Sequence, residues 1–195
     1  GGFSITTGSG GDTIEGSAGN DVISSGAGGD LITTTGGTDS ITTGTGSDDI
    51  SLSHTSGVTT ITDFADGVDD ISENVTGITG DELSITEAIA TRTVDDTDLV
   101  IFSGVNSATT SALATTGTET IADFTDTAAG GDVMDYLDEV FSVGNSDIAL
   151  FALNNGSSTY IYYYLNDADT AFDAGDTLNL IGVVNGVLDA ANFSA

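Results

Sequence analysis

Between residues 8 and 50 the chain reads GSGGDTIEGSAGNDVISSGAGGDLITTTGGTDSITTGTGSDDI, a pattern that repeats every nine residues. An aspartate opens each repeat of the pattern Asp-x-Ile, and the five members are Asp12, Asp21, Asp30, Asp39 and Asp48. A glycine stands two places before each acid, at Gly10, Gly19, Gly28, Gly37 and Gly46. A period of nine with one fixed apolar residue does not match the 3.6-residue spacing of an amphipathic helix. It indicates a short strand followed by a turn.

The residues around each isoleucine favour a strand, because most of them are β-branched or small. The glycine-rich remainder of each repeat favours a turn, where the backbone needs positive φ or close approach. Two repeats then make one coil of a solenoid, with alternate isoleucines on facing sheets. The pattern predicts one row of Ile5, Ile23 and Ile41 and a facing row of Ile14, Ile32 and Ile50. The predicted core is a narrow double row of isoleucine.

The charge of the chain excludes several classes of partner. Lysine and arginine together total one residue, Arg92, against 31 acids, which gives a formal net charge of -30. No basic surface is available for nucleic acid or for an anionic membrane, and no apolar run is long enough to span a bilayer. The 38% hydrophobic content still allows a packed core. We expect positive charge to come from outside the chain, as divalent cations.

The solenoid places the repeated acids on its two edges, with Asp12, Asp30 and Asp48 on one and Asp21 and Asp39 on the other. These carboxylates would repel one another if nothing lay between them. Calcium accepts several oxygens and tolerates mixed shells of carboxylates and carbonyls, so it fits between successive coils. The chain has no cysteine, which leaves oxygen as the main ligand atom. The alternative is a metal-free solenoid whose acids only decorate its turns.

This stretch, about residues 1–51, resembles the RTX (hemolysin-type) calcium-binding repeats. The resemblance implies a parallel β-roll with ions between alternate turns, held by the five repeated aspartates and the five glycines that precede them. It implies about three ions, two on the Asp12 edge and one between Asp21 and Asp39.

The repeats also depart from the family pattern. Phe3 stands where a first aspartate belongs, and Ser17 and Thr35 replace a glycine that Gly8, Gly26 and Gly44 keep. The chain opens in mid-repeat, so we expect it to be a fragment of a longer protein.

A second pattern occurs twice after residue 57, as TTITDFADGVDDISEN and as TETIADFTDTAAGGDVMDYL. Each copy holds an Ile-x-Asp-Phe segment, similar to the segment that commonly follows RTX repeats. There a strand delivers an acid to a calcium site and the aromatic ring seals the core. The candidate ligands are Asp63 and Asp69 in the first copy and Asp123 and Asp132 in the second. The alternative is that such acids cap their own turns.

The C-terminal part predicts a strand, an acidic loop and another strand. Tyr160, Tyr162 and Tyr164 alternate with Ile161, Tyr163 and Leu165, which is the period of a sheet with both faces occupied. The loop offers four candidate calcium ligands, Asp167, Asp169, Asp173 and Asp176, without the spacing of an EF-hand. Between the two Ile-x-Asp-Phe copies we expect a short helix near residues 81–92 and a strand at residues 99–102.

Taken together, the sequence predicts an all-β protein in two parts: a β-roll over residues 1–57 and a β-rich C-terminal region over residues 58–195. We expect no enzymatic activity, since the chain has no lysine or cysteine and its one histidine, His54, falls in a predicted turn. We expect instead a secreted, extracellular or cell-surface structural protein that binds calcium and associates with itself or with other surface proteins. The alternative is the C-terminal export and folding module of an RTX toxin, adhesin or hydrolase. The last residues resemble the uncleaved export region of such proteins.

Overall fold

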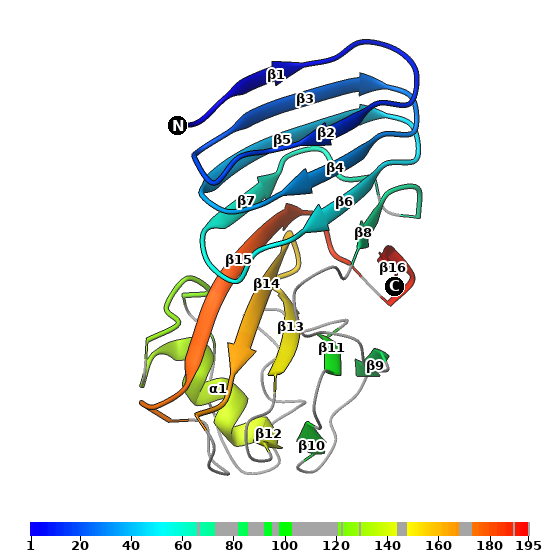
Figure 1. Ribbon diagram of the computed structural model, residues 1–195. Coiled ribbons are helices and arrows are strands. Elements are labelled where there is room, and N and C mark those ends of the chain that lie inside the picture. Colours follow the sequence, from blue (N-terminus) through cyan, green and yellow to red (C-terminus); the bar gives the residue numbers. More distant parts are fainter. Residues whose placement is uncertain are drawn as a thin grey trace.

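The computed structural model describes residues 1–65, 67–72, 82–85, 92–94, 98–102, 121, 123–128, 130–143, 148–167, 173–188 and 190–194. The first part is a parallel β-solenoid of four coils, which confirms the all-β prediction (Figure 1). Each coil adds one strand to each of two facing sheets. One sheet receives β1 (Ser4–Thr6), β3 (Val22–Ala27), β5 (Thr38–Thr45) and β7 (Val58–Ile61). The other receives β2 (Thr13–Glu15), β4 (Leu31–Thr34), β6 (Asp49–Leu52) and β8 (Asp70–Ser72).

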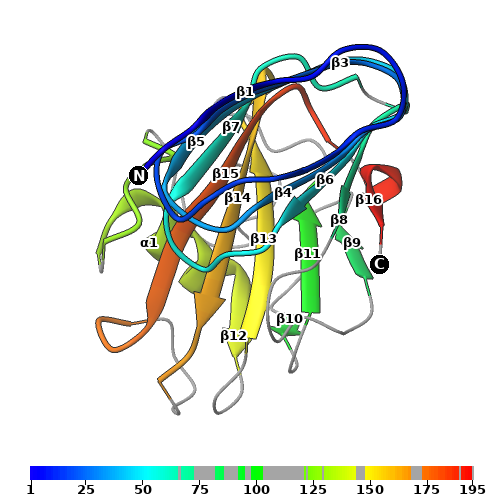
Figure 2. The same cartoon turned by 45° about the horizontal axis from the view of Figure 1, so that its top comes forward.

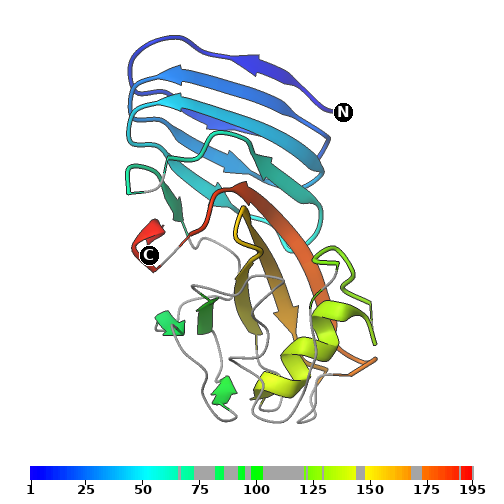
Figure 3. The ribbon, with the colours of Figure 1, turned by 180° about the vertical axis from the view of Figure 1, so that it is seen from behind.

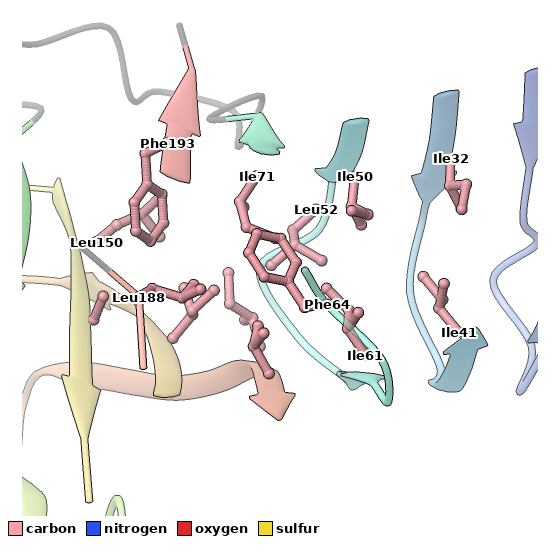
Figure 4. Close-up of a cluster of buried hydrophobic side chains, with 14 of the residues drawn as sticks. Ile32, Ile41, Ile50, Leu52, Ile61, Phe64, Ile71, Leu150, Leu188 and Phe193 are labelled. Atoms are coloured by element: carbon pink, nitrogen blue, oxygen red, sulfur yellow. The ribbon is translucent and has the colours of Figure 1, made fainter. Parts of the chain in front are cut away.

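The register of these strands stacks the isoleucines as predicted. In the first sheet Ile5, Ile23 and Ile41 pair in turn, and in the second Ile14, Ile32 and Ile50 pair in turn. From Ile14 onward these side chains are buried, and Ile32, Ile41 and Ile50 are fully so. Figure 4 shows Ile32 and Ile50 facing Ile41 and Ile61 across the interior of the coil. Figure 2 looks more nearly along the stack, where the coils overlie one another.

Both isoleucine rows continue beyond residue 57, where we expected the β-roll to end. Ile61 pairs with Ile41, and Ile71 pairs with Ile50. Successive coils are 18 residues apart in the earlier repeats but 20 or 21 apart here. The added residues fall in the connecting loops, so the strands keep their register although the nine-residue pattern is lost. The expected boundary therefore does not coincide with a break in either sheet.

The C-terminal region extends the same two sheets. Its strands are β9 (Glu82–Ile85), β10 (Arg92–Val94), β11 (Asp98–Phe102), β12 (Phe141–Val143), β13 (Ile148–Asn154), β14 (Ser158–Leu165), β15 (Thr177–Asn185) and β16 (Phe193–Ser194). The first sheet runs β1-β3-β5-β7-β15-β14-β13-β11-β9, and β16 pairs with β8 in the second. β10 and β12 form a separate pair. The parallel pairing of β15 with β7 joins the two parts without an interruption.

Alternate side chains of β14 enter two different cores, as the tyrosine pattern predicts. Ile161 and Tyr163 pack in the core that continues from the solenoid, which also includes Leu188 and Phe193 (Figure 4). Tyr162 and Tyr164 pack on the opposite face of the sheet in a second core. The solenoid interior is therefore closed at one end by the C-terminal sheet.

The second core is covered by α1 (Asp132–Val140), a helix that the sequence analysis did not predict (Figure 3). Val133, Met134, Tyr136 and Leu137 lie on its buried side, at helical spacing. The two Ile-x-Asp-Phe copies therefore continue differently, since the first leads into β8 and the second into α1. The helix expected near residues 81–92 is not found in its described parts, since residues 82–85 and Arg92 lie in strands. The strand expected at residues 99–102 is confirmed as part of β11. None of the described helices has the length and hydropathy of a membrane span.

The neighbours Leu31 and Ile32 allow a matched test of the isoleucine rows. Ile32 is fully buried, whereas Leu31 is 41% exposed on the outer face. We expect Ile32→Ala to lower the free energy of unfolding by about 2 to 5 kcal/mol, because it leaves a cavity between two coils. Leu31→Ala should cost less than about 1 kcal/mol. Urea unfolding followed by circular dichroism in saturating calcium measures both, and equal losses would contradict the arrangement of the core.

Candidate metal centre

One edge of the solenoid carries a column of four acids, hereafter the four-acid edge. Its members are Asp12, Asp30, Asp48 and Asp69, one from each coil. The backbone N–H of each acid donates to Oδ1 of the next acid along the column, at N–O distances of 2.8, 2.9 and 3.1 Å. These hydrogen bonds hold successive coils in register while they place carboxylates of like charge one above another.

Two oxygens in the middle of this column have no hydrogen-bond donor. They are Oδ2 of Asp30 and Oδ2 of Asp48, and these two residues are only 2% and 1% exposed. A buried carboxylate oxygen without a partner is costly, because it has lost its water and gained nothing in return. At the end of the column both oxygens of Asp69 have donors, from Asp48 N–H and Ala65 N–H. Within this column, the buried carboxylate oxygens without a hydrogen-bond donor therefore belong to the two inner acids, Asp30 and Asp48.

The neighbouring negative charges make the ionised form of Asp48 still less favourable. Burial raises the pKa of the Asp48 carboxyl, and the carboxylates of Asp69, Asp30 and Asp63 raise it further. The whole chain offers one lysine or arginine, Arg92, so it lacks the cations that normally offset such a cluster. A bound cation would supply both the missing charge and the missing partner of Oδ2.

The glycines of the repeat bring backbone carbonyls close to the next coil on this edge. Gly10, Gly28 and Gly46 all have positive φ, between 114° and 144°. A Cβ added at Gly28 would lie 2.5 Å from the carbonyl oxygen of Gly10, which is closer than a side chain tolerates. Carbonyls and carboxylates together are the ligand set that calcium prefers. In the described part of the chain no three carboxylates or histidines gather tightly enough to hold a metal by themselves. A calcium site here therefore needs these carbonyls, and the residues present fit it.

The opposite edge, hereafter the two-acid edge, has different chemistry. Its column consists of Asp21, Asp39 and, in the next coil, Thr59, which pairs with Asp39. Asp21 accepts from Phe3 N–H at 2.6 Å, from Ser17 N–H at 2.6 Å and from Ser17 Oγ at 3.0 and 3.2 Å. Burial alone would raise the pKa of Asp21, but these hydrogen bonds outweigh it and leave the pKa lowered.

Asp39 also has a potential donor near each oxygen. Asp21 N–H donates to its Oδ1 at 2.9 Å, and the Thr59 hydroxyl lies 3.4 Å from its Oδ2, although Thr34 Oγ1 at 3.1 Å competes for the one hydroxyl proton. Burial raises the pKa of Asp39, and Asp21 adds to the rise. Nε2 of His54 lies 3.1 Å from Thr59 Oγ1. His54 is in a loop, as predicted, but it is buried at 7% exposure. Burial lowers its pKa, against the opposing effect of Asp39.

The structure places the first Ile-x-Asp-Phe segment beside the four-acid edge. Phe64 packs in the solenoid core, as predicted. Asp63 accepts from Thr43 N–H at 2.8 Å and from Gly44 N–H at 2.9 Å, so both its oxygens are occupied. Asp63 thus acts on the column through its charge, while its carboxylate caps the turn above.

In the second segment, Asp123 and Asp132 also come together. Asp123 N–H donates to Asp132 Oδ2 at 2.8 Å, and Asp123 Oδ1 accepts from the backbone and the hydroxyl of Thr125. These two bonds lower the pKa of the exposed Asp123. The arrangement is that of a capped turn, the alternative that the sequence left open.

The C-terminal acidic loop is organised around Asp176. Its Oδ1 accepts from Asp167 N–H at 3.0 Å, and its Oδ2 accepts from Tyr164 Oη at 2.7 Å and from Asp173 N–H at 3.1 Å. Asp169, the fourth predicted ligand of this loop, lies outside the described residues. The other three are neighbours, but the carboxylate of Asp176 is already used by donors of its own loop.

The sequence contained a signal for two residues, Asp69 and Thr59, that we did not assign to the columns of the solenoid. Asp69 and Thr59 stand two residues before Ile71 and Ile61, as each repeated aspartate stands before its isoleucine. Extending the Asp-x-Ile pattern with longer loops would have added Asp69 to one column and Thr59 to the other. The donor role of Ser17 carried no such signal, because it depends on how the turn folds.

Comparison with known proteins gives one family match. The RTX calcium-binding nonapeptide repeat matches in four copies, over residues 6–41 and 25–52. No curated protein matches the chain. Among solved structures, the chain is similar to the solution structure of the AlgE6R3 subunit from the Azotobacter vinelandii mannuronan C5-epimerase. That likeness has 17% identity over 95% of this chain and 78% of that chain, with a TM-score of 0.25. The repeat match agrees with the acid columns and the glycine turns described above. Residues 6–52 of this chain are therefore similar to the RTX calcium-binding nonapeptide repeats.

Proposed function

We propose that this chain is a secreted structural protein that calcium folds outside the cell, where it assembles as a subunit of a surface layer or filament. The observation that carries the calcium step is the pair of buried, unpartnered oxygens at Asp30 and Asp48. Calcium bound there by these carboxylates, with carbonyls of the glycine turns, would supply positive charge between coils. Folding would then depend on the calcium concentration around the chain.

The energetics of such a switch are favourable. With a net charge of -30, the metal-free chain repels itself when it becomes compact. An ion present at about 100 times its dissociation constant stabilises the fold by about 2.7 kcal/mol per site. A few sites therefore add an amount comparable to the whole stability of an ordinary domain. The low calcium of a cytoplasm would keep the chain expanded, and the higher calcium outside would fold it.

Assembly is supported by an edge of the first sheet. Among the described strands, β9 is the last in this sheet and pairs only with β11. A strand in this position can pair with another chain. The proposal includes no catalytic activity. The one histidine, His54, is buried against Thr59, and the one arginine, Arg92, has no second cationic side chain with which to bind an anionic substrate.

The runner-up is an export and folding module at the end of an RTX toxin, adhesin or hydrolase. The C-terminal sheet favours it, because β15 and β16 extend both sheets of the solenoid and Leu188 and Phe193 close its interior. A solenoid needs a terminal cap of this kind to avoid exposing its core. Both functions share the calcium step and differ in whether the folded chain assembles.

Removal of calcium should unfold the repeats. In EGTA we expect circular dichroism to lose most of its β-signal, and added calcium should restore it, because the acid column then regains its missing charge. Magnesium at the same concentration is the control, since it demands a smaller octahedral site and releases its water reluctantly. A spectrum that does not change between EGTA and calcium would refute the switch.

The pH dependence of the metal-free chain should have an unusual sign. The pKa values of Asp39 and Asp48 are raised by burial, so the folded state binds protons more tightly than the unfolded state. Their contribution to stability is fully present below the ordinary value of 3.8 and is lost as pH rises through the raised values. Asp21, with a lowered pKa, acts in the opposite direction.

In EGTA we therefore expect β-signal to increase as the pH falls from neutral through the raised pKa values toward 3.8. Asp48→Asn should make this dependence shallower, because it removes one of the two carboxyls with raised pKa. In saturating calcium the sign should reverse, since protons compete with the ion for the same oxygens. Stability in EGTA that falls steadily with acid would show that the raised pKa values do not control the metal-free fold.

Assembly can be tested separately by electron microscopy with and without calcium. The structural role predicts ordered sheets or fibres that appear with calcium and disperse in EGTA. Calcium-folded particles that stay monomeric at all protein concentrations would favour the export module instead. Circular dichroism of the same samples shows whether the chain has folded, so a failure to assemble is not mistaken for a failure to fold.

A further inference from the structure

We infer that calcium joins the coils at the four-acid edge only, and that the hydroxyls of Ser17 and Thr59 close the two-acid edge in its place. This rests on the proposed function, in which calcium folds the repeats. It departs from our own sequence-based expectation of an ion between Asp21 and Asp39. The two edges share the Gly-x-Asp-x-Ile spacing, so the difference comes from the residues around it.

The donors of each carboxylate distinguish the edges. On the four-acid edge, Asp30 and Asp48 each have one donor, a backbone N–H to Oδ1, and their Oδ2 atoms have none. On the two-acid edge, Asp21 has a backbone donor for each oxygen and the Ser17 hydroxyl within reach of both. An ion at the first edge would occupy a free oxygen. An ion at the second would first have to displace hydrogen bonds to a buried carboxylate.

Hydroxyls also lie beside backbone carbonyls on the two-acid edge. Thr35 Oγ1 donates to the carbonyl of Gly16 at 3.3 Å, and Ser17 Oγ lies 3.2 Å from the carbonyl oxygen of Gly1. Ser17 and Thr35 are the two residues that replace the glycine of the repeat. On the four-acid edge the corresponding positions are Gly8, Gly26 and Gly44, which have no side chain to compete. The substitution of glycine therefore places a hydroxyl beside backbone carbonyls on this edge alone.

The third difference is the number of charges. The four-acid edge carries four stacked acids and has Asp63 beside it, whereas the two-acid edge ends in Thr59. Thr59 stands where the next acid would be, and its hydroxyl lies within hydrogen-bond reach of Asp39 Oδ2, Thr34 Oγ1 and His54 Nε2. A neutral hydroxyl at this position removes like-charge repulsion that a cation would otherwise have to offset. Polar side chains therefore do at this edge what calcium does at the other.

Matched substitutions in the full chain test the inference. Asp48→Asn keeps the oxygen that accepts Asp30 N–H and replaces only the free Oδ2. Asp39→Asn likewise keeps the acceptor of Asp21 N–H and replaces only the oxygen that faces Thr59. Isothermal titration with calcium chloride and native mass spectrometry would count bound ions in both variants and in the wild type. We expect Asp48→Asn to lose at least one ion and Asp39→Asn to lose none.

A second pair of variants removes the hydroxyls. Ser17→Ala and Thr59→Val should lower the melting temperature even in saturating calcium, because they leave Asp21 or Asp39 with fewer donors, while the ion count stays at the wild-type value. These variants also serve if Asp39→Asn does not fold. Loss of an ion in Asp39→Asn, Ser17→Ala or Thr59→Val would overturn the one-edge inference and leave the proposed function intact. A wild-type chain that binds no calcium would instead overturn the proposed function itself.

Discussion

The stacking of one buried carboxylate on another, coil after coil, is the constraint on which the solenoid depends. The N–H to Oδ1 bonds that connect Asp12, Asp30, Asp48 and Asp69 hold the coils at a fixed register, and this register also aligns the isoleucine rows. The same geometry forces negative charges together in the interior. Because the chain carries almost no cationic side chains, this register also creates the need for positive charge that we propose calcium meets.

The solenoid and the C-terminal region form one continuous structure. The first sheet passes from β7 to β15 without a break, and the core that begins with isoleucines ends with Leu188 and Phe193. A second core lies on the far face of β13, β14 and β15, where α1 covers Phe151 and Tyr162. Because β7 and β15 pair in one sheet, calcium bound at the edge as we propose would stabilise more than the repeats themselves.

The two edges show how a repeat can be modified without loss of the fold. A serine or threonine in place of glycine adds a hydroxyl at the turn, and a threonine in place of aspartate removes a charge from the column. At Ser17, Thr35 and Thr59 both changes fall on the same edge. The backbone path is kept, because the isoleucine rows and the remaining glycines still determine it. Only the source of the interactions between coils differs.

The sequence alone determined the features that are local and periodic. The nine-residue spacing specifies strand, turn and inward isoleucine within each repeat, and the alternation in β14 specifies the two faces of its sheet. Only the tertiary structure decided which carboxylate oxygens have donors, because the donors to Asp21 and Asp39 include groups about two repeats away in the chain. It also decided that the sheets continue past residue 57 and that Asp132–Val140 is helical. The continuation of the sheets was not predicted because longer loops there break the nine-residue period. The helix at Asp132–Val140 depends on the apolar face of β13, β14 and β15, which forms only when these later strands pair.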